Sequence, residues 1–200
     1  MKRLFPIFSF IFHPLFISFY TIVIYLFSIK SNNFINEINY IYKAFIITVF
    51  IPLIIFYLLI RFKKIENSMI NNVNERKTPL FLQLISYFIT TLSLVHYSDR
   101  YLLNYFIASG ISTIIALYFT FLNKKISLHM LSITGMSSWI ILNHIKLDSL
   151  YFLCLTITLL VLSSCVAISR LVMKAHTRTE LILGTLSGII PQIILFILQQ

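Results

Sequence analysis

Apolar runs of membrane-spanning length follow one another along most of this 200-residue chain, and they limit what it can fold into. A helix needs about 20 apolar residues to cross the hydrocarbon core of a bilayer. Inside that core every backbone N–H and C=O must find a partner within the protein, which favours helices. We therefore predict an all-α, polytopic transmembrane helical bundle of six or seven spans, formed by residues 10–27, 41–60, 80–97, 101–122, 129–145, 150–168 and 181–198.

The composition supports a single integral-membrane domain that covers residues 1–200. Hydrophobic residues make up 58% of the chain and charged residues 11%, against about 25% charged residues in soluble domains. The first apolar run follows a Lys-Arg pair and continues to Phe27 without a small-residue cleavage site, so we expect a retained span rather than a signal peptide. Pro6, Pro14 and Pro52 should bend or delay helices without excluding them.

The chain is also strongly basic, with 16 Lys and Arg against 6 Asp and Glu. In a soluble protein this balance would suggest nucleic acid. Here the basic residues lie in the breaks between apolar runs, where such residues contact anionic headgroups and set topology. We therefore predict an integral protein of a bacterial cell (inner) membrane, with membrane lipids and no nucleic acid among its partners. An anionic substrate is a second interpretation of the same charges.

Three of the breaks, residues 61–79, 123–127 and 169–180, are long or basic. Two predicted spans separate the first break from the second, and two more separate the second from the third. Because an even number of crossings returns the chain to the same side, the three breaks should meet at one membrane surface. A site built from all three breaks requires this arrangement.

These breaks contain the polar residues from which a site could be built. His176 and Glu180 are four residues apart, so on a helix they would share one face and Glu180 could accept a hydrogen bond from the imidazole. That bond would fix the tautomer and leave the other ring nitrogen as a nucleophile. Ser127 could cap the helix that begins near His129, where the N-terminal amides favour an anion.

At the third break the chain resembles the type 2 phosphatidic acid phosphatase superfamily of membrane phosphatases. The third motif of that family is Ser-Arg, five residues, His, three residues, Asp. Ser169, Arg170 and His176 match this motif, with Glu180 in the acid position.

The other two motifs match less fully. The second family motif is Pro-Ser-Gly-His, and the segment ISLH keeps Ser127 and His129 but has leucine at 128 where the family has glycine. The first motif is Lys, six residues, Arg-Pro; Arg76 fits the arginine, Met69 stands in the place of the lysine, and the proline is delayed to position 79. The resemblance covers residues 69–180 and the following helix, where two glycines in GTLSG suit close packing. The first 60 residues add only membrane spans to the match.

The resemblance implies a metal-independent phosphoric ester or diphosphate hydrolase that uses no cofactor. His176 would attack phosphorus to form a phosphohistidine, Glu180 would orient it, and His129 would protonate the leaving oxygen. Cations and donors that meet at the three equatorial oxygens stabilise such a transition state. The residues expected to hold the phosphate are Arg76, Ser127, Arg170 and, in place of the missing lysine, Lys125, with Lys77 and Arg178 as further sources of positive charge.

The substrate implied is a lipid phosphate monoester or diphosphate whose tail lies between helices. The sequence does not choose among phosphatidic acid, phosphatidylglycerophosphate and a polyprenyl diphosphate, and it leaves the oligomeric state open. The positive-inside rule places the basic breaks in the cytoplasm, whereas the resembled family usually works on the outer face, so the side of the site also stays open. Two alternatives remain: an inactive homologue that binds lipid phosphates, and a transporter or structural membrane protein whose basic breaks only set topology.

Overall fold

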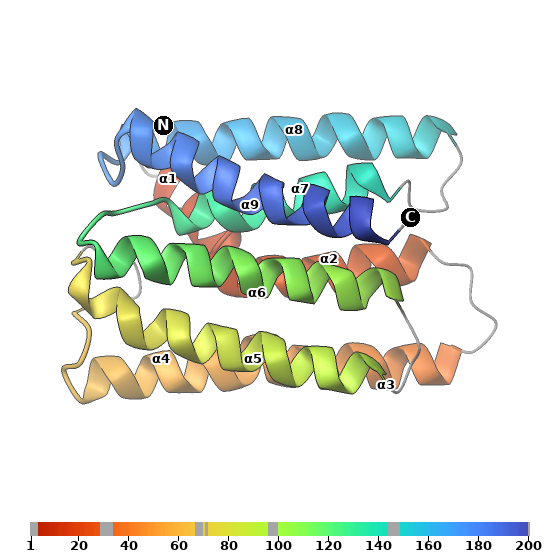
Figure 1. Ribbon diagram of the computed structural model, residues 1–200, viewed down its shortest axis with the longest axis horizontal. Helices are drawn as coiled ribbons and strands as arrows, with labels where there is room; N and C mark the ends of the chain where they lie inside the picture. The colour runs from red at the N-terminus through yellow and green to blue at the C-terminus, as the bar shows by residue number, and fades with distance from the viewer. Residues whose placement is uncertain are drawn as a thin grey trace.

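The computed structural model describes residues 4–28, 34–66, 70, 72–95, 100–143 and 149–199, and its regular structure there is entirely helical. Met69 lies outside the described residues. The helices lie side by side in a bundle (Figure 1). In chain order they are α1 (Leu4–Ile11), α2 (Pro14–Ser28), α3 (Phe34–Phe45), the π-helical turn η1 (Ile46–Phe50), α4 (Ile51–Arg61), the 3-10 turn η2 (Asn74–Arg76), α5 (Lys77–Val95), α6 (Arg100–Phe121), α7 (Leu128–Leu142), α8 (Ser149–Val172) and α9 (Arg178–Leu198).

Within the described residues, four helices are long and apolar enough to cross a membrane: Ile38–Arg61, α6, α8 and α9. A fifth span results if α1 and α2, which are bent by 57° at the break between them, count as one. The prediction of six or seven spans is therefore wrong. Helix α7 has 15 residues and rises about 22 Å, which is short of a hydrocarbon core of about 30 Å. Helix α5 interrupts its apolar run with Gln83, Ser86 and Thr90.

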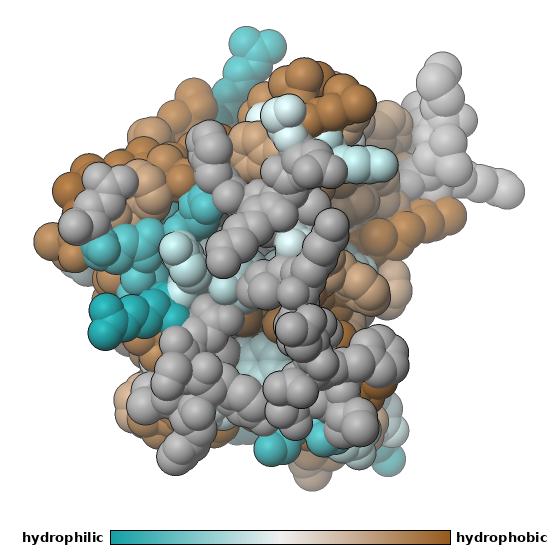
Figure 2. Space-filling view, turned by 90° about the vertical axis from the view of Figure 1, so that its right-hand side faces the viewer, coloured by the Kyte–Doolittle hydropathy of each residue, from teal (hydrophilic) through white to brown (hydrophobic). Residues whose placement is uncertain are grey.

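The outside of the bundle is rich in exposed apolar side chains, as expected for helices that face lipid. Large side chains are exposed on α5, α8 and α9, including Phe88, Tyr151 and Ile197. The end view in Figure 2 shows apolar residues around the perimeter of the molecule. These surfaces are consistent with a membrane protein.

The three basic breaks lie at the same end of the bundle, as predicted. Helices α5 and α6 run in opposite directions, as do α7 and α8, so each pair returns the chain to the end from which it started (Figure 1). The described parts of the segments before α5, between α6 and α7, and between α8 and α9 all lie at the left-hand end in that view. This arrangement brings the polar residues of the three breaks within reach of one another.

Two prolines shape the helices near that end. Pro14 is the first residue of α2, directly after the bend. Pro52 follows the π-helical turn η1, and proline lacks the N–H that continues a regular helix. The Ser86 hydroxyl of α5 donates a 2.9 Å hydrogen bond to the Ile47 carbonyl in this turn. A neighbouring helix thus supplies a donor where the helical pattern is disturbed.

Helices α7 and α9 approach each other closely because glycines stand where side chains would collide. A Cβ atom at Gly184 would overlap the Ser127 carbonyl, and one at Gly188 would overlap the Leu131 carbonyl and the Thr134 hydroxyl. A backbone hydrogen bond of 3.0 Å from the Ser127 N–H to the Glu180 carbonyl joins the two helix starts. The predicted close packing of the GTLSG segment is confirmed.

We expect Gly188→Ala to destabilise the protein. The added methyl group would force α7 and α9 apart, and overpacking of this kind typically costs about 1–3 kcal/mol. Gly110→Ala is the matched control, because the nearest atom to its added Cβ is Leu84 Cδ1 at 3.8 Å. It should be neutral or stabilising by up to about 1 kcal/mol, since alanine is the better helix former. Thermal unfolding in detergent measures both variants, and equal stability would contradict the close packing.

Candidate functional site

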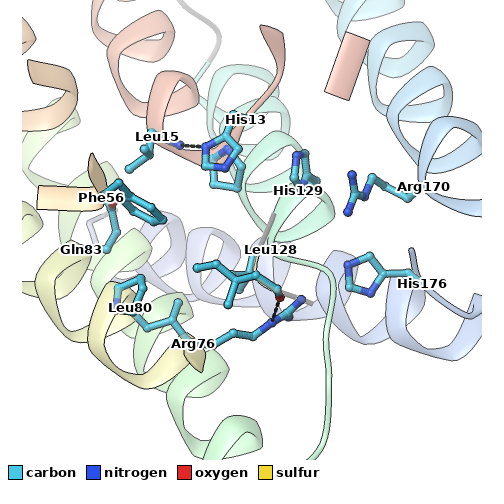
Figure 3. A pocket seen from close by; sticks show the side chains of 13 residues that line it. His13, Leu15, Phe56, Arg76, Leu80, Gln83, Leu128, His129, Arg170 and His176 are labelled. Carbon is cyan, nitrogen blue, oxygen red and sulfur yellow. Dashed lines mark hydrogen bonds between the residues drawn. The ribbon is translucent and has the colours of Figure 1, made fainter. Parts of the chain in front are cut away.

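A small cavity lies at the end of the bundle where the basic breaks meet. Figure 3 shows His129, Arg170 and His176 on one of its sides. Phe56 and Leu80 lie on the other side, together with Gln83. The structure thus brings together residues that are far apart in the sequence and that the sequence predicted to converge. The polar groups that line the cavity are His13, Arg76, Gln83, His129, Arg170 and His176.

His176 and Glu180 form the hydrogen-bonded pair that their spacing predicts. Helix α9 begins after Thr177, whose hydroxyl accepts a hydrogen bond from the Glu180 N–H, so Glu180 lies in the first turn. From there its carboxylate accepts a 2.6 Å hydrogen bond from His176 Nδ1. Because Nδ1 carries the proton in this bond, Nε2 is left with a lone pair.

The His176 ring is neutral at pH 7. Its pKa is lowered from 6.5 to about 3, first by burial and then by the positive charges of Arg76, Lys125 and Arg170. The residue is only 7% exposed, so little solvent screens these charges. A neutral imidazole with one nitrogen held by a carboxylate has the form that a histidine nucleophile requires.

His129 lies at the start of α7, which Ser127 caps. The Ser127 hydroxyl accepts a 3.4 Å hydrogen bond from the Met130 N–H, which confirms the predicted cap. Ser127 is fully buried in this role, so its hydroxyl serves the helix in the structure rather than the cavity. The His129 Nε2 donates a 3.1 Å hydrogen bond to the Ser9 carbonyl of α1, because a carbonyl can only accept.

Arg170, near the end of α8, lines the cavity beside His129 and His176 (Figure 3). It is 2% exposed, although guanidinium groups are rarely buried. Its Nη1 donates a 3.3 Å hydrogen bond to the Ser9 hydroxyl. A buried cation of this kind is well placed to meet an anion that enters the cavity.

Arg76 lines the cavity and is only 4% exposed. Its Nε donates to the Ile70 carbonyl at 3.1 Å and its Nη1 to the Ile126 carbonyl at 2.8 Å. Burial, above all, lowers its pKa to about 10, which leaves it charged at pH 7. Arg76 therefore ties the first and second breaks together and adds positive charge to the cavity wall.

Lys125 lies beside the cavity rather than on its lining. Its Nζ donates a 3.0 Å hydrogen bond to the Ala175 carbonyl, which joins the second break to the third. Burial and the charge of Arg76 both lower its pKa. Lys77 stands over the Phe121 ring at 5.2 Å, so it is directed to an aromatic neighbour. Of the candidate replacements for the missing lysine, Lys125 is the one whose charge acts on His176.

The first 60 residues, which add only membrane spans to the family match, contribute side chains to the cavity. His13 lies at the break between α1 and α2, and its ring is 5.4 Å from the His129 ring, nearly perpendicular to it. Ser9 of α1 contacts both His129 and Arg170. The His-Pro pair at positions 13 and 14 was the available signal, because a proline after a polar residue in an apolar run marks a helix break.

No family profile, curated protein or solved structure matches this chain.

The depressed pKa of His176 predicts how stability depends on pH. The folded ring binds a proton only near pH 3, whereas the unfolded ring binds one near pH 6.5. Between these values the unfolded state holds more protons, so stability should fall as the pH drops from about 6.5 towards 3. His176→Asn keeps a donor for Glu180 but does not titrate. Its melting temperature should therefore fall less than that of the wild type between pH 7 and pH 4. If the melting temperatures of the two proteins fell by the same amount between pH 7 and pH 4, this result would contradict the neutral, buried state of His176.

Proposed function

We propose that this protein is a membrane lipid-phosphate phosphatase, a divergent relative of the type 2 phosphatidic acid phosphatase superfamily in a bacterial cell membrane. His176 carries the proposal. Its Nδ1 is held by Glu180, and the ring lines the same cavity as Arg170 and His129. A nucleophile, a buried cation and a second histidine around one cavity are the parts that transfer of a phosphoryl group to an imidazole needs.

The reaction follows from these positions. His176 Nε2 would donate its lone pair to phosphorus as the bond from phosphorus to the lipid oxygen breaks. The negative charge of a bound phosphate favours the protonated form of His129, which would keep its Nε2 hydrogen bond to the Ser9 carbonyl and give its Nδ1 proton to the leaving oxygen. Water would next attack the phosphohistidine, return a proton to His129, and release phosphate and His176. Arg170, Arg76 and Lys125 would stabilise the charge on the phosphoryl oxygens throughout.

A neighbouring apolar groove favours a lipid over a soluble phosphate ester. It runs between η1–α4 and α5, and it shares Phe56, Pro79 and Gln83 with the polar cavity. A headgroup in the cavity could thus continue into a tail that lies among apolar side chains. The other residues that line the groove are Ile47, Ile51, Pro52, Ile55, Leu82, Ile85, Ser86 and Ile89.

A lipid-phosphate binder without turnover is the second candidate. Leu128, where the family has glycine, lines the cavity and takes up room near the start of α7. Arg76 already donates two hydrogen bonds to backbone carbonyls, so less of its donor capacity is left for phosphate. Both departures would weaken catalysis more than electrostatic attraction of an anion.

Phosphate release from a panel of lipid phosphates separates the two candidates. The wild type should release phosphate, and His176→Ala should abolish turnover. His176→Asn should be equally inactive, because it keeps the donor to Glu180 but lacks the nucleophilic nitrogen. His129→Ala should lower kcat by about 10²–10⁴-fold, as loss of a general acid typically does. Turnover by His176→Asn would refute the phosphohistidine route. A wild type that binds lipid phosphate without releasing phosphate would support the second candidate, the binder without turnover.

Chelation tests the expected metal independence. The whole chain contains 6 Asp and Glu, and a Mg²⁺ site normally draws on carboxylates and substrate phosphates. Phosphate release should therefore continue in EDTA at an unchanged rate. Loss of activity in EDTA that added Mg²⁺ restores would point to a metal-dependent mechanism instead.

A further inference from the structure

At the break between α1 and α2 the chain changes direction, so that α1 packs within the bundle. Helix α1 is bent by 57° from α2 and packs against α8. The Leu15 N–H donates to His13 Nδ1 at this break, and Figure 3 shows His13 facing the cavity beside His129. One turn before the break, Ser9 is fully buried between α7 and α8.

Ser9 contacts two site residues through two different groups. Its hydroxyl accepts a hydrogen bond from Arg170 Nη1 at 3.3 Å and lies 2.9 Å from the Ser169 hydroxyl. Its carbonyl accepts the 3.1 Å hydrogen bond from His129 Nε2. Ser169 also donates to the Phe5 carbonyl, so it keeps a partner on α1 if the Ser9 hydroxyl is removed.

These contacts have consequences for a phosphate site. Hydrogen bonds to charged groups are stronger than those between neutral groups, and a buried guanidinium that loses an acceptor moves or recruits water. The Ser9 carbonyl also selects the tautomer of His129 in which Nε2 carries the proton. Ser9 therefore contributes to the orientation of the Arg170 guanidinium and determines which nitrogen of His129 carries the proton.

We propose that Ser9 is a positioning residue that aligns Arg170 and His129 with the nucleophile, so that the broken helix α1–α2 is part of the site. The role in turnover rests on the proposed phosphatase function, whereas the contact with Arg170 can be tested without it. Both carbonyl and hydroxyl act through other residues, and neither needs to touch the substrate.

Kinetics on Ser9→Ala test the role in turnover. The variant keeps the carbonyl for His129 but removes one acceptor of Arg170, so kcat/KM should fall about 10-fold or more, with a rise in KM. In an Arg170→Ala background the same change should have almost no further effect, because the interaction is already lost. Ser18→Ala is the control, since Ser18 is a buried serine of α2 that bonds Tyr87 instead. Two outcomes would overturn the role of Ser9. One is that the losses of kcat/KM from Ser9→Ala and Arg170→Ala are additive in the double variant, and the other is that Ser9→Ala alone leaves kcat/KM unchanged.

Chemical modification of Arg170 provides a readout that needs no activity. Phenylglyoxal attacks accessible guanidinium groups, and peptide mass spectrometry locates the product. Arg170 should react several-fold faster in Ser9→Ala than in the wild type or Ser18→Ala. If no lipid phosphate is hydrolysed by the wild type, the proposed function fails, yet faster modification would still support the contact between Ser9 and Arg170. Equal rates in all three proteins would overturn that contact whether or not the protein is an enzyme.

Discussion

The close approach of α7 and α9 holds the candidate site together. Gly184 and Gly188 let the two backbones meet, and the hydrogen bond from Ser127 to Glu180 joins the starts of both helices. His129 and His176 each lie within two residues of one of these starts. The distance between the two histidines is therefore set by backbone contacts rather than by flexible side chains. This gives the rigid support that a reacting geometry needs.

Positive charges outnumber negative ones around the cavity. The charges of Arg76, Lys125 and Arg170 all act on His176, and Glu180 accepts a hydrogen bond from its Nδ1. This excess of buried positive charge disfavours a protonated His176 and favours an anion in the cavity. In the proposed phosphatase, the same field would keep the nucleophile neutral and attract the phosphate that it attacks. The headgroup of a lipid phosphate would carry the charge that the field favours, and its tail would lie in the neighbouring apolar groove.

Several parts of the site could be predicted because they depend on short-range geometry. The spacing of four residues predicted the bond between His176 and Glu180, and a serine before an apolar run predicted the cap at Ser127. The convergence of the three basic breaks followed from counting crossings. The count of spans was less successful, because apolar runs of similar appearance became helices of different length, such as 15 residues in α7 and 24 in α8.

The sequence by itself determined that the chain is helical and rich in membrane-length apolar segments, and which polar residues share one end. These properties follow from local composition, helical periodicity and the order of segments. Only the tertiary structure decided that Ser9 and His13 join the site and that Arg76 donates hydrogen bonds to backbone carbonyls. Ser9 lies 161 residues from Arg170 in the chain. The physical reason is that the angle of the bend, 57°, and the packing of α1 on α8 determine where its hydroxyl lies. Pro14 signals a break in the helix, but neither that angle nor that packing follows from the spacing of residues.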